Sequence, residues 1–516
     1  MGVFKTAPDP PTFILPLKGG GNLSVSPMMT WPDYLILFAF LGAVLVLGYI
    51  KGRGKTTQDF FVARRQIPWW VACMSFVATE VSAVTLISVP AIAFMENLEY
   101  AQFYIGSAAA RLVIAFLFIP AFYRYNCVTI YDFLRQRFGA ATQQTATIFF
   151  FVTRLLGSGV RIMVAALAVS VLMDWRLAPT LALFTVVAIG YVIYGGIKAA
   201  VWAGIIQTSV YLLGGLAAIV YILHLVPGGI HGALSVSSAA GRMQIWNWGP
   251  ALHDSSFLKK FLTDPNIVWI AVLNGFFGSM AAFGTDHELM QRLLTVETRR
   301  LSQKTMAATV VASGVLLAVY LILGVSLFAF FQTHPGVPLP QKLDAIFPYF
   351  IGRVMPVGLR GLLLGAIGLA SLDTPLASLT ASFVNDIYRP VIRPGKDDAH
   401  YLKVSRVCVG VFAALIAAIA YGFSFYQKFL WLAFKIGGVT FGSMLGVFLL
   451  GLLTGRRANR ANIIGMTVMA AINAALLILS EMRIMPLGWT WLIIIGTAGT
   501  MLIGWVFGPG MENGDA

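Results

Sequence analysis

Charged residues are scarce in this sequence: they make up 11% of its 516 residues, whereas a soluble domain normally contains about 25%. Apolar residues make up 58%, and the mean hydropathy is +0.81. Together these values exclude an ordinary soluble protein and indicate an integral membrane protein.

Cysteines and long polar connections are also rare. Cys73, Cys127 and Cys408 have neither the spacing of a metal site nor that of a disulfide framework. The longest connection, residues 227–265, is rich in Gly and Ser and too weakly patterned to form a separate soluble domain. Residues 1–30 lack the hydrophobic region of a cleavable signal peptide, so we expect them to be retained as a tail.

Long apolar runs fill the rest of the chain. A run of about 20 apolar residues can cross a hydrocarbon core of roughly 30 Å as a helix. We expect about thirteen such spans and a single transmembrane domain over residues 31–510. The spans begin near Tyr34, Ile67, Leu98, Thr147, Leu177, Ala199, Asn266, Met306, Val357, Ser405, Lys428, Asn462 and Leu487.

The net charge of +15 comes from basic residues that gather on alternate loops. Lys51, Arg64, Arg299 and Arg456, for example, all fall on one predicted side. By the positive-inside rule this side is cytoplasmic, which places the N-terminal tail outside and residues 511–516 inside. The basic residues therefore orient the protein and need not bind nucleic acid.

A charge at bilayer depth costs about 3 kcal/mol or more, so a charged side chain within a span usually faces the protein interior or a water-filled path. Four such residues stand out, and Arg111 and Arg154 also fall inside spans. The four are Glu80, Arg161, Asp373 and Lys435.

Asp373 lies among hydroxyl residues, and Pro375 cannot donate a hydrogen bond to the carbonyl of Ser371. A free carbonyl, the Ser371 and Thr374 hydroxyls and a carboxylate would suit a hard monovalent cation. The alternative is that the small residues of this segment only let helices approach closely. Asp373 favours the ion site.

Glu80 lies in a segment, residues 75–90, that is crowded with small and β-branched residues. An interrupted helix there would expose backbone carbonyls at mid-membrane, as secondary transporters require. The alternative is a straight helix in which Glu80 forms a buried ion pair with Arg161. Arg161 would suit a carboxylate solute, and Lys435 lies too far from a helix end for snorkelling to explain it well.

Four segments resemble the sodium/solute symporter family, which includes bacterial sodium/sialic acid, sodium/galactose and sodium/proline symporters. Three are "TIYDFLRQRFG" (residues 129–139), "GGIKAAVWAGIIQ" (195–207) and "GTDHELMQR" (284–292). The fourth is "GLASLDTPLASLTASFVNDIY" (368–388). The resemblance implies an all-α, LeuT-like fold of two inverted five-helix repeats, about residues 67–454, with core helices one and six broken.

The resemblance also implies a sodium ion between core helices one and eight. Its ligands would be the carbonyls of Ala78, Val81 and Ile367 and the side chains at Ala370 and Ser371.

The sequence departs from the family at two places. Ala370 stands where the family usually has a hydroxyl. Gly204 stands where many members have an aspartate for an additional cation, and Asp373 stands where several of those have a serine. We therefore expect a second cation site at Asp373, Thr374 and Gly204, with the carboxylate exchanged between facing helices.

The solute cavity of relatives is lined at positions that match eight residues of this chain. Arg161 suggests an anionic solute and Glu80 a cationic one, so a zwitterion would satisfy both. The eight residues are Glu80, Ser82, Thr85, Tyr104, Arg161, Asp286, Phe434 and Lys435.

The function predicted from these features is cation-coupled symport by alternating access in a bacterial plasma membrane. Sodium would be the coupling ion, and the solute a sugar, sialic acid, amino acid or carboxylate, carried by a monomer. The alternatives are proton coupling through Asp373 or Glu80 and, with less support, a substrate sensor. An enzyme is disfavoured, because "HELMQ" at residues 287–291 has Gln where a zinc protease needs its second His.

Overall fold

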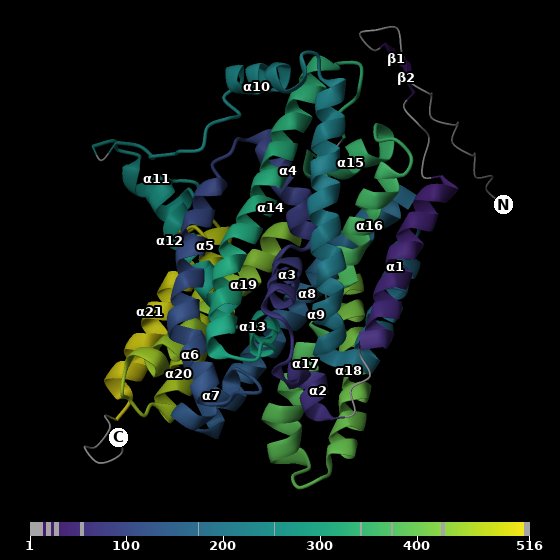
Figure 1. Ribbon diagram of the computed structural model, residues 1–516. Helices are drawn as coiled ribbons and strands as arrows, with labels where there is room; N and C mark the ends of the chain where they lie inside the picture. The colour runs from purple at the N-terminus through teal and green to yellow at the C-terminus, as the bar shows by residue number, and fades with distance from the viewer. Residues whose placement is uncertain are drawn as a thin grey trace, which may run out of the picture.

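The computed structural model of the chain describes residues 14–16, 22–24, 30–51, 56–173, 175–251, 253–340, 343–372, 375–424 and 429–509. Helices dominate the described part, and most run up and down through one bundle, with α10 at one end and α7 at the other (Figure 1). Two short strands pair near the N-terminus.

In the described part of the chain, the two strands form the only sheet. In order, the elements are β1 (Ile14–Pro16), β2 (Asn22–Ser24), α1 (Trp31–Lys51), α2 (Thr57–Val62), η1 (Ala63–Arg65), α3 (Trp69–Glu80), α4 (Ala83–Met95), α5 (Ala101–Val113), η2 (Ile114–Phe118), α6 (Ile119–Arg124), α7 (Tyr131–Arg137), α8 (Ala140–Met173), α9 (Leu177–Leu225), α10 (Gly229–Ala239), α11 (Phe257–Thr263), α12 (Val268–Gly284), α13 (His287–Leu294), α14 (Arg299–Thr333), η3 (Leu343–Ala345), α15 (Ile346–Arg353), α16 (Leu359–Leu372), α17 (Leu376–Ser382), η4 (Phe383–Ile392), α18 (Asp398–Phe423), α19 (Phe429–Leu453), α20 (Asn459–Glu481) and α21 (Thr490–Phe507).

Ten of the described helical segments are long and apolar enough to cross a membrane, and the bent pair α3–α4 would add an eleventh. Helix α9 has 49 residues, which corresponds to roughly 70 Å of helix. This length is sufficient for two membrane crossings of roughly 30 Å each. The backbone of α9 leaves the helical region at Gly196 (φ 50°), so this element contains both spans expected at Leu177 and Ala199. The total of thirteen spans stays a prediction.

The expected breaks in core helices one and six are present. Helices α3 and α4 meet at an angle of 65°, because Val81 and Ser82 have extended backbones. Helix α12 ends at Gly284, and the extended Asp286 precedes α13. The alternative of a straight helix at Glu80 is therefore wrong.

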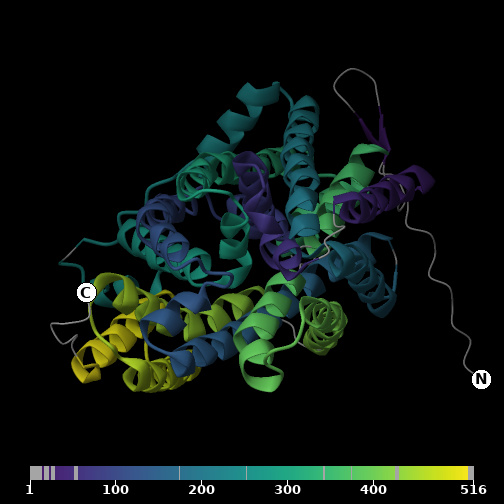
Figure 2. The same ribbon diagram turned by 60° about the horizontal axis from the view of Figure 1, so that its bottom comes forward.

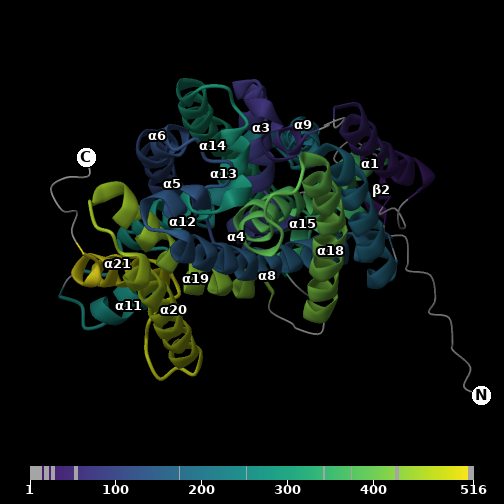
Figure 3. The same ribbon diagram turned by 90° about the horizontal axis from the view of Figure 1, so that it is seen from below.

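The surface of the bundle is apolar where lipid would lie. Phe116, Val220 and Val311, on different helices, are each about 70% exposed, and exposed residues of this kind suit a hydrocarbon solvent. Helices α1 and α21 lie at opposite margins of the bundle, as Figures 2 and 3 show.

Glycines bring α5 and α12 into close contact. A Cβ at Gly106 would lie 1.9 Å from the carbonyl oxygen of Val272, and one at Gly275 would lie 2.0 Å from that of Phe103. No side chain fits at either position, so the two backbones touch as small-residue interfaces in membranes allow. This contact fixes two walls of the cavity described below.

Two of the family-like segments meet at the α7 end of the bundle. Asp386 of η4 accepts hydrogen bonds from Thr129 (2.7 Å), Gln143 (2.9 Å) and Thr147 (3.1 Å). All four side chains are buried. A buried carboxylate satisfied in this way fixes η4 against α7 and α8.

Candidate functional site

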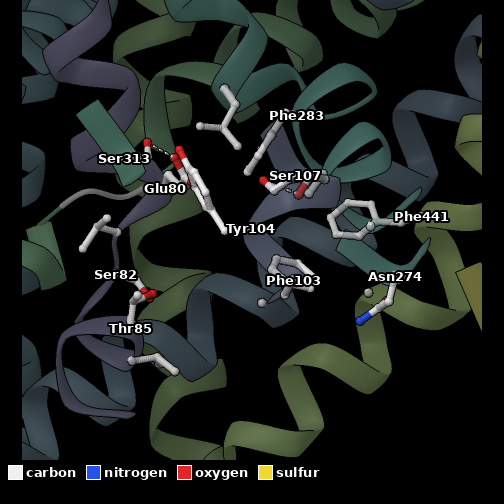
Figure 4. Close-up of a pocket in the computed structure, with 18 of the residues that line it drawn as sticks. Glu80, Ser82, Thr85, Phe103, Tyr104, Ser107, Asn274, Phe283, Ser313 and Phe441 are labelled. Carbon is white, nitrogen blue, oxygen red and sulfur yellow. Dashed lines mark hydrogen bonds between the residues drawn. The ribbon is translucent and has the colours of Figure 1, made fainter. Parts of the chain in front are cut away.

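A cavity of about 310 Å³ lies beside the break between α3 and α4. Helices α5, α8, α12, α13, α14, α19 and α21 supply the other walls. Five of the eight predicted solute residues line it: Arg161 and, labelled in Figure 4, Glu80, Ser82, Thr85 and Tyr104. Segments far apart in the sequence therefore converge where the first broken helix exposes its backbone.

Glu80 is the last residue of α3, and its carboxylate is engaged on both oxygens. Arg111 of α5 forms an ion pair with Oε1, and the Ser313 hydroxyl of α14 donates to Oε2 at 2.6 Å (Figure 4). Arg161, the partner in the straight-helix alternative, is not the one observed. The alternative of a Glu80–Arg161 pair is thus corrected to Glu80–Arg111.

Arg111 is fully buried and ties several helices together. It donates to the Thr309 hydroxyl at 3.0 Å, and its guanidinium lies 4.6 Å from the centre of the Phe283 ring of α12. A cation over an aromatic face is stabilised by the ring quadrupole. The sequence showed Arg111 as a charge within a span, but it gave no sign that α3, α5, α12 and α14 meet around it.

Arg161 approaches the cavity from α8. Its Nη1 donates to the carbonyl of Thr79 at 3.3 Å, in the last turn of α3. Carbonyls in the last turn of a helix lack intrahelical partners, which explains why a guanidinium finds an acceptor there. Arg161 therefore joins α8 to the broken helix at mid-bundle.

Ser82 and Thr85 lie at the beginning of α4, where the first helical N–H groups have no intrahelical acceptor. The Ser82 side chain makes no capping hydrogen bond to this helix. The positive end of the helix dipole and these two hydroxyls thus lie in the lining of the same cavity as Arg161. Such an arrangement favours an anion.

Asp286 is placed differently from the other predicted solute residues, because it is fully buried and does not line the cavity. It caps α13 by accepting the N–H of Glu288 at 2.9 Å. Arg154 of α8, which does line the cavity, lies 2.8 Å from Asp286 and 2.7 Å from Glu288. The contact of Asp286 with solute stays a prediction.

Lys435 also lies away from the cavity lining. Its Nζ is 2.7 Å from Glu481 at the end of α20, while the neighbouring Gly437 and Gly438 line the cavity. Phe434 lies on α19, and its side chain is outside the described part of the chain. The solute contacts of both residues stay predictions.

The predicted sodium ligands lie on the two helices named for them. Ala78 and Val81 flank the break of α3, and Ile367 and Ala370 lie on α16; all four are buried. The Gln207 side chain of α9 donates to the Leu369 carbonyl at 3.0 Å and fixes α16 nearby. The Ser371 side chain and residues 373–374 lie outside the described part of the chain, so the predictions for Asp373 and Thr374 concern residues outside it too.

Gly204 packs directly against α3. A Cβ there would lie 2.5 Å from the Cα of Ser75, so an aspartate could enter only if the two helices moved apart. The exchange of a carboxylate between Gly204 and Asp373 stays a prediction, and the close contact provides a packing reason for the glycine.

Comparison with known proteins gives consistent results. The model of the family described as "Sodium:solute symporter family" matches residues 60–468. The sodium/sialic acid symporter NanT of Aliivibrio fischeri is 27% identical over 495 residues, covering 93% of this chain and 94% of NanT. The sodium-coupled monocarboxylate transporter 1 of Xenopus laevis is 26% identical and covers 82% of this chain and 68% of that protein.

A solved structure of a Na⁺-coupled sialic acid symporter, in a substrate-bound outward-open state, has the same fold. Its TM-score is 0.82 at 22% identity, and the match covers 94% of this chain and 99% of that one. The LeuT-like fold expected from the sequence is therefore confirmed.

Proposed function

This chain belongs to the sodium:solute symporter family and couples solute transport to sodium, and from that premise we propose that its solute carries a carboxylate. Arg161, Ser82, Thr85 and the N-terminus of α4 would hold this group. The observation that carries the proposal is that Arg161, Ser82 and Thr85 line one cavity, into which the beginning of α4 also opens. The relatives named above are described as carrying sialic acid and monocarboxylates, both of which are carboxylates.

Sodium would bind where α3 breaks, between the carbonyls of Ala78, Val81 and Ile367 and the side chains at Ala370 and Ser371. An ion there bridges α3 and α16 and favours the conformation in which they are close. The same conformation orders the beginning of α4, so ion and solute would increase each other's affinity. A second cation at Asp373 and Thr374 stays part of this proposal.

Alternating access would require the contacts below the cavity to open. The cavity reaches Trp489 and Ile493 at the beginning of α21. On the α7 side, all eight residues of α13 are buried. We propose that this is an outward-facing state, closed on the cytoplasmic side by the ion pairs of Arg154 with Asp286 and Glu288.

The protein is a transporter and not an enzyme, and it is a multi-pass protein of the plasma membrane. We propose the orientation predicted from the basic loops: residues 1–30 outside, one transmembrane domain over residues 31–510 with its repeat core at about 67–454, and residues 511–516 inside. We further propose a monomer that binds a small solute and lipid and no nucleic acid.

Uptake into proteoliposomes tests the proposal. Radiolabelled N-acetylneuraminate and pyruvate are offered under an inward sodium gradient or under a pH gradient alone. Sodium-driven uptake of either acid is expected, with a loss of at least tenfold in Arg161→Gln and none in Arg300→Gln, an exposed arginine at the start of α14. Uptake driven by the pH gradient alone, or uptake unaffected by Arg161→Gln, would contradict the proposal.

A further inference from the structure

The walls of the cavity carry more information about the solute than its charge. Among the described residues, Glu80 is the one acidic side chain in the lining. In an amino-acid transporter it would be the natural partner of an ammonium group. Its surroundings argue against that role.

Both carboxylate oxygens of Glu80 already have partners within the protein. Arg111 neutralises the carboxylate, and Ser313 donates to it at 2.6 Å. An incoming ammonium group would have to displace a guanidinium that is itself fully buried. Breaking a buried ion pair leaves an uncompensated charge in a medium of low polarity, which is strongly unfavourable.

The hydroxyl groups of the lining are also largely engaged with the protein. Ser279 donates to Ser107 at 2.7 Å, Thr153 donates to Thr440 at 2.6 Å, and Tyr320 donates to the carbonyl of Tyr211 at 3.1 Å. The hydroxyl of Tyr104 donates to the carbonyl of Val310. A polyhydroxylated solute would therefore find few partners, and each buried hydroxyl without one costs about 1–3 kcal/mol.

Apart from Arg154 and Asn274, most of the remaining lining is apolar, and it includes aromatic rings from three helices. Its main contributors are Val84, Phe103, Phe283, Leu316, Leu317 and Phe441. A volume of about 310 Å³ lies at the small end of ligand cavities. These walls suit a compact body of hydrocarbon or an aromatic ring.

We propose that Arg111 is a specificity-determining residue: by engaging Glu80 it makes the cavity select carboxylates with an apolar body and no ammonium group. This inference rests on the carboxylate site proposed above. It replaces the zwitterion expected from the sequence, because Glu80 and Arg161 do not form the two ends of one solute site.

Thermal stabilisation of the purified protein in sodium measures the selection. The ligands are 3-phenylpropionate, L-phenylalanine, which adds an ammonium group to it, and N-acetylneuraminate, which has a polyhydroxylated body. Linked binding raises the unfolding temperature. We expect 3-phenylpropionate to bind at least 100-fold more tightly than L-phenylalanine and at least tenfold more tightly than N-acetylneuraminate.

Two variants test the role of the ion pair. Arg111→Met leaves the Glu80 carboxylate without its ion-pair partner. In this variant, the ratio of the affinities for 3-phenylpropionate and L-phenylalanine should fall by at least tenfold. If that variant does not fold, Ser313→Ala tests the same point, because Oε2 of Glu80 then lacks a donor; we expect a severalfold gain in affinity for L-phenylalanine. Ser326→Ala is the matched control, since its hydroxyl donates within α14, to Ile322.

The outcomes separate the two proposals. Equal binding of L-phenylalanine and 3-phenylpropionate, or tighter binding of N-acetylneuraminate, overturns the selection but leaves the carboxylate site standing. An unchanged preference in the folded variants overturns the role of Arg111. If none of the three acids binds, the carboxylate proposal itself fails.

Discussion

Arg154 and Asp286 form a buried ion pair of 2.8 Å that joins α8 to the beginning of α13. Their side chains are 7% and 1% exposed. Helix α8 packs mainly against α18 and α19, whereas α13 packs mainly against α3, α17 and α12. The pair therefore connects two groups of helices just below the cavity.

Loss of this connection should favour the inward-facing state. Removing one partner of a buried pair typically costs about 3–5 kcal/mol, because the other charge is left uncompensated. In Arg154→Gln, water entering from the cytoplasmic side would solvate Asp286 and Glu288 and relieve that cost. We expect faster thiol labelling of a cysteine introduced at the buried Gln291 of α13, with the native cysteines replaced by serine.

Arg300→Gln serves as the control for this labelling, since Arg300 is exposed at the start of α14. Equal labelling rates in the two backgrounds would show that the Arg154 pairs do not hold the cytoplasmic side closed.

A second buried pair, Asp33 with Arg360, should act on stability and not on transport. Both side chains are fully buried, and Arg360 donates to Asp33 Oδ2 through Nε (2.9 Å) and Nη2 (2.7 Å). Arg360→Met should lower the free energy of unfolding by about 3–5 kcal/mol. The double variant Asp33→Leu with Arg360→Met should recover most of this loss, as thermal unfolding will show.

The solute affinity of the folded Arg360→Met variant should stay unchanged, because the pair joins α1 to α16 away from the cavity lining. If the stability loss of the double variant equals the sum of the losses in Asp33→Leu and Arg360→Met, the two side chains are not coupled.

The acid stability of the α7 end of the bundle should depend on Asp132 of α7, which lies outside the membrane-crossing helices. Burial raises the pKa of its carboxyl above the ordinary 3.8, although the N–H groups of Val128 and Thr129 oppose the shift. The folded chain therefore binds this proton more tightly than the unfolded chain. Stability should fall as the pH rises from the ordinary to the raised pKa.

Asp132→Asn removes this titrating carboxyl group. Over that pH range, the variant should therefore lose less stability than the parent, as measured by thermal unfolding. Asp254→Asn is the control, because the pKa of Asp254 is shifted in the opposite direction. Hydrogen bonds from Ser256 lower the pKa of Asp254, so its contribution is lost as the pH falls. Identical pH profiles for Asp132→Asn and the parent would contradict this assignment.

Much of the architecture followed from the sequence, because apolar runs of membrane-crossing length have few other solutions in a bilayer. The break at Val81 and Ser82 was also predictable, since small and β-branched residues surround Glu80. The partner of Glu80 was not. Arg111 and Arg161 are both arginines within spans, and only the packing of α5 against α12 places Arg111 beside the carboxylate.

Among the remaining site residues too, some positions follow from the local chain and others depend on how the helices pack. Ser82 and Thr85 were assigned to the solute cavity from the resemblance, and they line the cavity because they directly follow the break along the chain. Asp286 and Lys435 were assigned to the solute from the resemblance, yet their partners here are Arg154 and Glu481. Which side chain a buried charge contacts depends on helix rotation and register, which hydropathy does not specify.

Ala370 provides the sharpest test of the sodium site, because it stands where the family usually has a hydroxyl and lies buried on α16. A serine there would add one oxygen ligand next to the carbonyl of Ile367. A ligand worth about 1.4 kcal/mol corresponds to a tenfold change in affinity. We therefore expect Ala370→Ser to lower the sodium concentration needed for half-maximal thermal stabilisation and for half-maximal uptake by about tenfold.

Ala366→Ser, one turn earlier on the same buried helix, is the matched control and should leave both values unchanged. Potassium in place of sodium should give no stabilisation in either variant. If the two serines have the same effect, or if Ala370→Ser weakens sodium binding, the ion does not lie between α3 and this turn of α16.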